Sequence, residues 1–180
     1  MKENKLLYQT NWINMYESKH GFIYCQRKGI NSIAALVYKK IKNQTYFLVR
    51  YQPLPEIADK KSDFEPYPCA ITGTIEPNQT PLECALKEVF EEASIVVTKN
   101  NLVTQNKYIA TTQSNETVFN FLLEVDSDTE QSNQNCDNSI FELNSFNKWI
   151  TLEDLQKIVK NELHHSSLAE LLLMYLLNCK

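Results

Sequence analysis

The stretch Gly73–Ile95, GTIEPNQTPLECALKEVFEEASI, decides the fold of this 180-residue chain. It begins with residues typical of a turn and continues into a helical pattern. Thr80 and Glu83 have the spacing of a capping box, in which two side chains satisfy backbone N–H groups of the first turn. Pro81 suits the first helical position because its missing N–H would have no partner there. The pattern therefore predicts a helix that begins at Pro81 and ends near Ala93.

This helix would carry acidic side chains on one face. Glu88, Glu91 and Glu92 lie together because positions i, i+3 and i+4 share one side of a helix. Their repulsion is unfavourable unless water screens it or a cation neutralises it, and carboxylate oxygens suit a hard divalent cation such as Mg²⁺. A solvated acidic face is the alternative interpretation. The face expected to enter the core comprises Leu82, Ala85, Leu86, Val89 and Ala93.

The order of these features resembles the Nudix box. That motif runs Gly, five residues, Glu, seven residues, Arg-Glu, an aliphatic residue, any residue, Glu-Glu, any residue, Gly and an aliphatic residue. The resemblance implies an α/β fold, an α/β/α sandwich with a mixed central sheet, and a Mg²⁺-dependent pyrophosphohydrolase. Interleaved strand and helix patterns along the chain favour the same fold class. The positions that match without a gap are Gly73, Glu88, Val89, Glu91, Glu92 and Ile95.

Three box positions depart from the family pattern. Gln79 and Lys87 replace a Glu and an Arg, so a hydrogen bond can remain but an ion pair with the planar fork of Arg cannot. Ser94 replaces the glycine that best fits a left-handed helix end. We expect a weakened support around intact carboxylates, with a larger effect on rate than on fold. The alternative is a degenerate Nudix domain that binds a nucleotide or a partner without turnover.

Segments outside the box resemble the ADP-ribose pyrophosphatase branch. YFLVRYQPLPE at 46–56 contains Arg50, and YIATTQSNE at 108–116 ends at Glu116, although the proline typical of the branch is Thr111 here. The resemblance implies ADP-ribose or a related nucleotide sugar as substrate, with contacts from Arg50, Gly73 and Glu116. A surface ion pair for Arg50 and a solvated position for Glu116 are the alternatives.

The resemblance also implies roles in catalysis. Glu88, Glu91 and Glu92 would bind Mg²⁺, with Mn²⁺ as the alternative ion, and the backbone oxygen of Thr72 would add a ligand. Such ions neutralise a diphosphate and position the attacking water. A general base must remove a proton from that water. Glu142, on the loop before the last strand, is the candidate base, and a box glutamate, Glu92, is the alternative.

Composition excludes several classes of function. The net charge of −4, without a basic run, argues against a nucleic-acid partner. No apolar stretch has the length of a signal peptide or a membrane span, so we expect neither. Five widely spaced cysteines without a CxxC pair indicate reduced thiols and a cytoplasmic location. The ligand that the resemblance implies is a small nucleoside diphosphate derivative.

The chain is expected to form a single Nudix domain over 1–180, with the box at 73–95. Residues 1–28 would be an N-terminal extension, which the ADP-ribose branch implies is a strand region for a homodimer. The segment 126–139 is polar and is expected to be a mobile loop. His164 and His165 are interpreted as a polar turn between two helices. Strands are predicted over 22–27, 32–38, 46–51, 102–110, 117–125 and 146–150, and further helices over 152–162 and 167–178.

Overall fold

The structure, a computed structural model, describes residues 4–131 and 140–179. Its strands are β1 (Lys5–Gln9), β2 (Ile13–Glu17), β3 (Ile23–Arg27), β4 (Ser32–Ile41), β5 (Gln44–Pro53), β6 (Pro66–Cys69), β7 (Ile71–Thr74), β8 (Leu102–Ile109), β9 (Thr117–Val125) and β10 (Phe146–Thr151). Its helices are α1 (Pro81–Ala93), the 3-10 turn η1 (Lys99–Asn101), α2 (Ile140–Leu143), α3 (Leu152–Asn161) and α4 (Ser166–Asn178).

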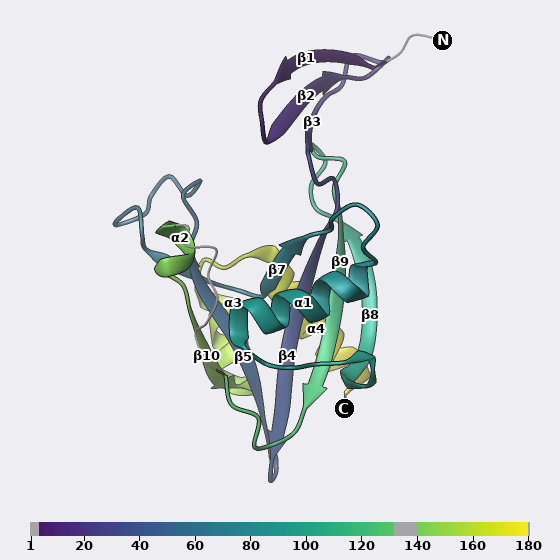
Figure 1. Cartoon of the computed structure of the whole chain (residues 1–180). Helices are drawn as coiled ribbons and strands as arrows, with labels where there is room; N and C mark the ends of the chain where they lie inside the picture. Colours follow the sequence, from purple (N-terminus) through teal and green to yellow (C-terminus); the bar gives the residue numbers. More distant parts are fainter. Residues whose placement is uncertain (1–3, 132–139, 180) are drawn as a thin grey trace.

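The main sheet is mixed, as expected from the sequence. Its strands follow the order β10-β5-β4-β9-β8, with β6 beside β5 and β7 beside β4 (Figure 1). Strands β4 and β9 pair in parallel, and the other described pairs of this sheet are antiparallel. This arrangement confirms the predicted fold class.

The sheet forks at β4, and the fork creates space beside it. One half of β4 pairs with β7, from Ser32 opposite Thr74 to Ala35 opposite Ile71. The other half pairs with β5, beginning at Val37 opposite Leu48. Beyond that point β5 leaves β4 and pairs with β6 instead. The segment of β5 that follows the fork therefore faces the end of α1 rather than another part of β4.

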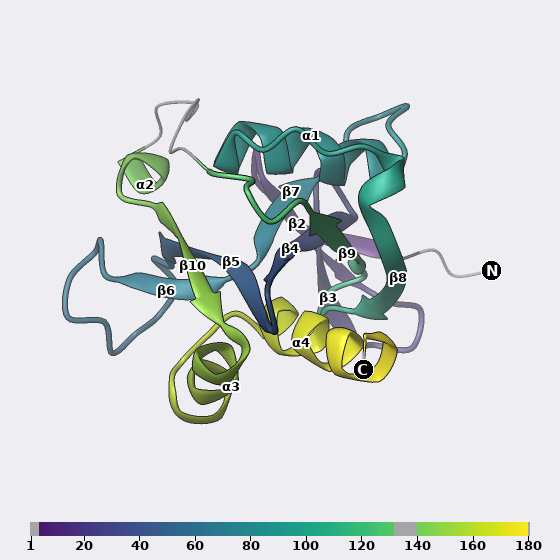
Figure 2. The same cartoon turned by 90° about the horizontal axis from the view of Figure 1, so that it is seen from below.

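Helices cover both faces of the sheet, which gives the sandwich its three layers (Figure 2). Helix α1 packs on one face, where Val89 and Ala93 join a cluster with Phe121 of β9. Helices α3 and α4 cover the other face, where Leu168 joins a second cluster with Leu36 of β4. Because both of its faces are covered, the central strand β4 is a nearly continuous apolar run rather than an alternating one.

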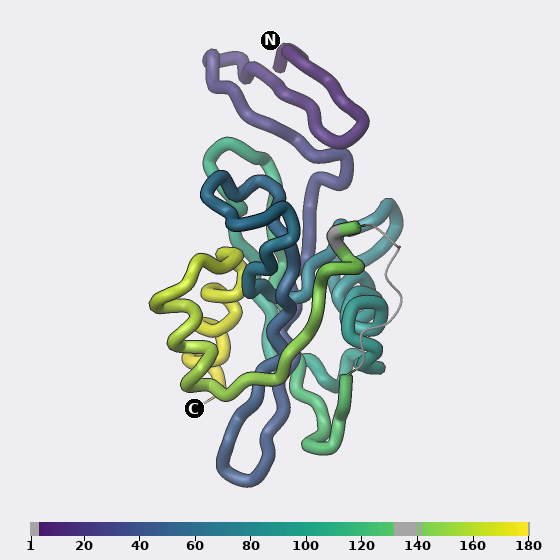
Figure 3. Tube along the Cα trace, turned by 90° about the vertical axis from the view of Figure 1, so that its left-hand side faces the viewer, coloured from purple at the N-terminus to yellow at the C-terminus, as the bar shows by residue number. Residues whose placement is uncertain are grey.

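The N-terminal strands form a small antiparallel sheet, β1-β2-β3, that stands apart from the main sheet (Figures 1 and 3). The backbone of β3 is tied to the turn between β8 and β9, because the Cys25 N–H donates to the Gln113 carbonyl at 2.8 Å. Several large apolar side chains of this sheet remain exposed, and Trp12 is 82% exposed. The division of the chain into a Nudix domain with an N-terminal extension stays a prediction.

The sequence patterns identified most of the longer elements but missed several short ones. Strands β6 and β7 and helix α2 were not predicted as separate elements, because each is four residues long and has no clear period. Strands β1 and β2 lie in the expected N-terminal strand region, for which no bounds of single strands were predicted. Part of the expected mobile loop, 132–139, lies outside the described residues. Four cysteines in the described part are free thiols. None of the described helices is long and apolar enough to cross a membrane.

Candidate active site

Helix α1 has the start and end that its sequence predicts. The Thr80 side chain accepts from the Glu83 N–H, and the Glu83 side chain accepts from the Thr80 N–H at 2.8 Å, which completes the capping box. At the other end Ser94 takes a left-handed conformation with φ of 55°, and its N–H bonds to the Phe90 carbonyl. A serine therefore occupies the helix end that the family pattern gives to glycine, at some conformational cost.

Glu88 lies directly against Gly73 of β7. A Cβ atom built on Gly73 would fall 2.4 Å from the Glu88 carboxyl carbon, which is far inside contact distance. The glycine thus leaves the space that the glutamate side chain fills. Burial raises the pKa of Glu88 to about 7, and the neighbouring charge of Glu91 adds to the shift.

Glu92 is the most deeply buried of the helix carboxylates. Its side chain is 14% exposed, and Oε2 lies 3.4 Å from Nε of Arg50 on β5. The backbone of Thr72 also acts on this carboxylate and favours its charged form, which lowers the pKa. Burial nevertheless raises the pKa of Glu92 to about 8, because it outweighs the opposing influence of Arg50.

Two buried side chains also hold the backbone of α1 at Glu92. Asn147 of β10 donates through Nδ2 to the Glu92 carbonyl at 2.6 Å, and Arg50 donates through Nη1 to the same oxygen at 3.4 Å. Both side chains reach the helix because the fork of the sheet leaves β5 and β10 facing its last turn. Sequence reasoning missed Asn147, since a single asparagine in a predicted strand carries no signal of a helix contact.

The remaining box residues make exposed contacts. Lys87 lies 3.3 Å from a Glu91 carboxylate oxygen and 3.9 Å from a Glu76 oxygen, so it pairs within the box rather than with Gln79. The Gln79 side-chain oxygen accepts from the Glu76 N–H and closes the turn before the helix. Arg50 and Asn147 hold the last turn of α1 from the sheet through contacts that do not involve Gln79 or Lys87.

Glu142 approaches the same region from α2. Its negative charge contributes to the raised pKa of both Glu88 and Glu92. Glu116 lies elsewhere: it forms an ion pair with Arg27 at 3.0 Å and accepts from Ser32 at 2.6 Å. The structure therefore gathers most of the predicted site residues around the last turns of α1 and places Glu116 beyond β7. Those gathered are Arg50, Thr72, Gly73, Glu88, Glu92 and Glu142.

The donor set suits a hard cation. Carboxylates of α1 converge on β7, and Glu92 Oε2 is buried without a hydrogen bond from any residue that the structure describes. In the same described part, no three His, Cys, Asp or Glu side chains are yet close enough together to hold an ion. Glu91 in particular is turned toward Lys87. Rotation of Glu91 about its own side chain would bring a further carboxylate to the group, with no change in the backbone of α1.

Comparison with known proteins agrees with this geometry. The NUDIX domain family matches residues 31–172. A crystal structure of a C. elegans Ap4A hydrolase binary complex is 17% identical, has a TM-score of 0.53, and aligns over 81% of this chain and 96% of its own. A second structure of C. elegans Ap4A hydrolase is 20% identical, with a TM-score of 0.50 and coverage of 81% and 97%. These identities show a shared fold alone. No curated protein matches the sequence significantly.

Proposed function

Because this chain belongs to the Nudix family, whose domain spans residues 31–172, we propose that it hydrolyses the pyrophosphate bond of a nucleoside diphosphate linked to another moiety. The observation that carries the proposal is the burial of Glu88 and Glu92 beside β7, with the charge of Glu142 acting on both. Clustered, buried carboxylates are unfavourable when ionised. A divalent cation would turn this unfavourable cluster into a binding site.

The residues proposed to hold Mg²⁺, or Mn²⁺ in its place, are Glu88, Glu91, Glu92 and the backbone oxygen of Thr72. When bound, the ion would supply charge neutralisation at the diphosphate and a lowered pKa of water. Gly73 would let Glu88 and the substrate approach the backbone of β7 closely. Arg50, only 4% exposed, would act on the substrate through Glu92, whose carboxylate and carbonyl it holds.

A carboxylate near the cluster would serve as the general base. Glu142 is the proposed base, since it comes from a different element than the helix carboxylates and its charge reaches both of them. Glu92 is the alternative, because it belongs to the same group of carboxylates and would be ionised once a cation is bound. The variants Glu142→Gln and Glu92→Gln distinguish them. Turnover depends on pH at the acidic end of the pH–rate profile because the base must be ionised, and this dependence disappears in the variant that lacks the base.

ADP-ribose or a related nucleotide sugar is the proposed substrate. Support comes from the segments around Arg50 and Glu116, which resemble the ADP-ribose pyrophosphatase branch. Ap4A, which the similar C. elegans structures name, is the competing candidate. A dinucleoside tetraphosphate carries more negative charge than a nucleoside diphosphate sugar, so the substrate panel distinguishes the two candidates.

The test is a substrate panel assayed with Mg²⁺. ADP-ribose, ADP-glucose, diadenosine tetraphosphate and a nucleoside triphosphate are incubated with wild-type protein, Glu92→Gln and Glu153→Gln. Glu153 is an exposed, ion-paired glutamate of α3 and provides the matched control. Turnover that survives in Glu153→Gln and falls at least about 100-fold in Glu92→Gln supports the proposal. Binding without turnover of any compound would instead support the degenerate module.

A homodimer formed through the N-terminal sheet is also proposed. Several of its large apolar side chains are exposed, and gathered exposed apolar residues mark interaction sites. Replacement of Trp12 and Phe22 by Glu is expected to convert a dimer to a monomer in light scattering. Wild-type protein that runs as a monomer at all concentrations would refute it. The exposed members of this surface are Leu6, Leu7, Tyr8, Trp12, Ile13, Met15, Phe22 and Ile23.

A further inference from the structure

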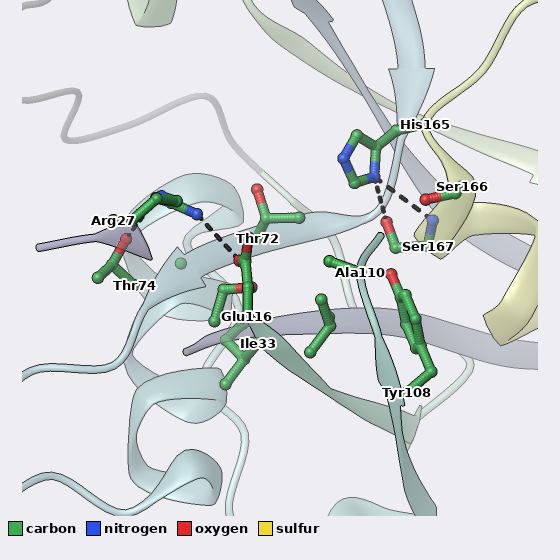
Figure 4. A pocket seen from close by; sticks show the side chains of 13 residues that line it. Arg27, Ile33, Thr72, Thr74, Tyr108, Ala110, Glu116, His165, Ser166 and Ser167 are labelled. Carbon is green, nitrogen blue, oxygen red and sulfur yellow. Dashed lines mark hydrogen bonds and ion pairs between the residues drawn. The ribbon is translucent and has the colours of Figure 1, made fainter. Parts of the chain in front are cut away.

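A polar cavity of about 370 Å³ lies on the far side of β7 from α1 (Figure 4). Its walls come from β3, β4, β7, β8, the start of β9 and the start of α4. The volume equals that of about a dozen water molecules, and it lies in the range of small-molecule sites. The residues that the argument uses are Arg27, Thr72, Tyr108, Ala110, Glu116 and His165.

Arg27 and Glu116 form a fixed polar wall of this cavity. The Arg27 guanidinium donates from Nη1 to Glu116 Oε1 at 3.0 Å and from Nη2 to the Thr74 hydroxyl at 2.9 Å. The Ser32 hydroxyl donates to the same Glu116 oxygen at 2.6 Å. Each described contact of this carboxylate uses Oε1. Its second oxygen therefore remains an acceptor for a ligand hydroxyl.

His165 supplies a donor on the opposite wall. Its Nδ1 accepts from the Ser167 N–H at 3.4 Å and lies 2.7 Å from the Ser167 hydroxyl. Burial lowers the pKa of His165, so the ring is neutral near pH 7. With Nδ1 accepting, the proton of the neutral ring resides on Nε2. Figure 4 shows this nitrogen on the side of the ring that faces away from Ser167.

The cavity adjoins the candidate active site through β7. Thr72 and Gly73 line the cavity. The Thr72 backbone also acts on the Glu92 carboxylate, and Gly73 lies against Glu88. A single strand therefore separates the cavity from the carboxylates. A group attached directly to a diphosphate held at α1 would therefore reach the cavity, because only one strand lies between them.

The charges and shape of the lining select the chemistry of that group. A phosphate would face the Glu116 carboxylate, and the Arg27 charge that could offset this repulsion is already paired with it. A purine base could stack on Tyr108 or His165, the two aromatic rings among the described lining residues, and in that case ADP and ADP-ribose would bind equally. An uncharged ring with several hydroxyl groups meets an acceptor on one wall and a donor on the other.

We propose that this cavity binds the sugar that is joined to the nucleoside diphosphate, with its hydroxyls donating to Glu116 and accepting from His165. The inference rests on the proposed function, because it takes the diphosphate to lie at α1. It adds a specificity: the enzyme distinguishes a diphosphate-linked sugar from a longer polyphosphate by hydrogen bonds beyond β7. Arg27 and Ser32 are positioning residues that hold the Glu116 carboxylate.

The test compares the binding of ADP-ribose with that of ADP, which lacks the second sugar. Calorimetric titrations are made with Ca²⁺ in place of Mg²⁺, over times in which no hydrolysis is detected. Ala110→Leu fills the cavity without removing a polar group, and Glu116→Gln keeps the shape but weakens the acceptor. Glu153→Gln is the control for the loss of an ion-paired glutamate on α3. Thermal unfolding of each variant verifies that it folds.

We expect wild-type protein and Glu153→Gln to bind ADP-ribose at least about tenfold more tightly than ADP, a difference of about 1.4 kcal/mol. Ala110→Leu and Glu116→Gln are expected to lose that difference while their affinity for ADP stays within about twofold. Equal affinity of wild-type protein for the two compounds, or an equal loss of both in the folded variants, overturns the sugar site. If the wild-type protein hydrolyses other pyrophosphates in that case, the proposed function stands. If the wild-type protein hydrolyses no compound but still binds ADP-ribose more tightly than ADP, the sugar site stands and the proposed function does not.

Discussion

Gly73→Ala tests whether the glycine of β7 exists to admit Glu88. The added Cβ would lie 2.4 Å from the Cγ, Cδ and Oε1 atoms of Glu88. Ordinary contact begins at about 3.4 Å, so the carboxylate must retreat by about 1 Å. A misplacement of about 1 Å at a reacting centre can cost about 100-fold in rate. We therefore expect kcat/KM to fall by about that factor, with little change in the unfolding temperature, because φ of Gly73 lies outside the left-handed region.

A double-mutant cycle identifies the cause of this loss. Glu88→Ala removes all three atoms that the new Cβ would meet, so Gly73→Ala should reduce activity by no more than about twofold in that background. The assay is hydrolysis of the best substrate of the panel with Mg²⁺, with thermal unfolding measured in parallel. Wild-type activity in Gly73→Ala, or the same 100-fold loss with and without Glu88, would refute the reasoning.

Three further predictions concern stability. Asn147→Ala removes the shortest hydrogen bond to the Glu92 carbonyl and should lower the free energy of unfolding by about 1–3 kcal/mol in urea titrations. An unchanged free energy of unfolding would show that the Asn147 amide is dispensable. Thr80→Ala removes the helix cap and should cost about 1 kcal/mol in the same titration while activity persists; unchanged stability would contradict the cap. The pKa values of Glu88 and Glu92 are raised in the folded state to about 7 and 8, so the folded state holds protons that the unfolded state releases. Metal-free stability should therefore fall as pH rises from about 5 to 8, and Mg²⁺ should restore it at the upper end; a flat unfolding temperature would count against this.

The sequence predicted the parts of the site that local spacing controls. The capping box and the helix periodicity place Glu88 and Glu92 together without any knowledge of the tertiary fold, and the boundaries of α1 confirm that prediction. The apolar run at 32–38 likewise predicted a strand, which β4 confirms. Both features depend on interactions between residues close in the sequence.

Features that depend on sheet topology were beyond the sequence. Asn147 meets Glu92 because β10 pairs with β5 at the fork, and a hydrogen bond across 55 residues leaves no local pattern. The ion pair of Arg27 with Glu116 spans 89 residues, and it decides that Glu116 belongs to the cavity beyond β7 rather than to the carboxylate cluster. The expected weakening from Gln79, Lys87 and Ser94 stays a prediction, and the contacts of Arg50 and Asn147 with the last turn of α1 were not foreseen.

Cation binding by α1 tests the account most directly. Free Mn²⁺ has a strong electron paramagnetic resonance signal that is lost when the ion is bound, so titration of wild-type protein, Glu153→Gln and the double variant Glu88→Gln/Glu92→Gln measures the site without a substrate. The account predicts that the first two proteins bind Mn²⁺ with the same affinity and that the double variant binds it at least about tenfold more weakly. Equal Mn²⁺ affinity in all three proteins would contradict it.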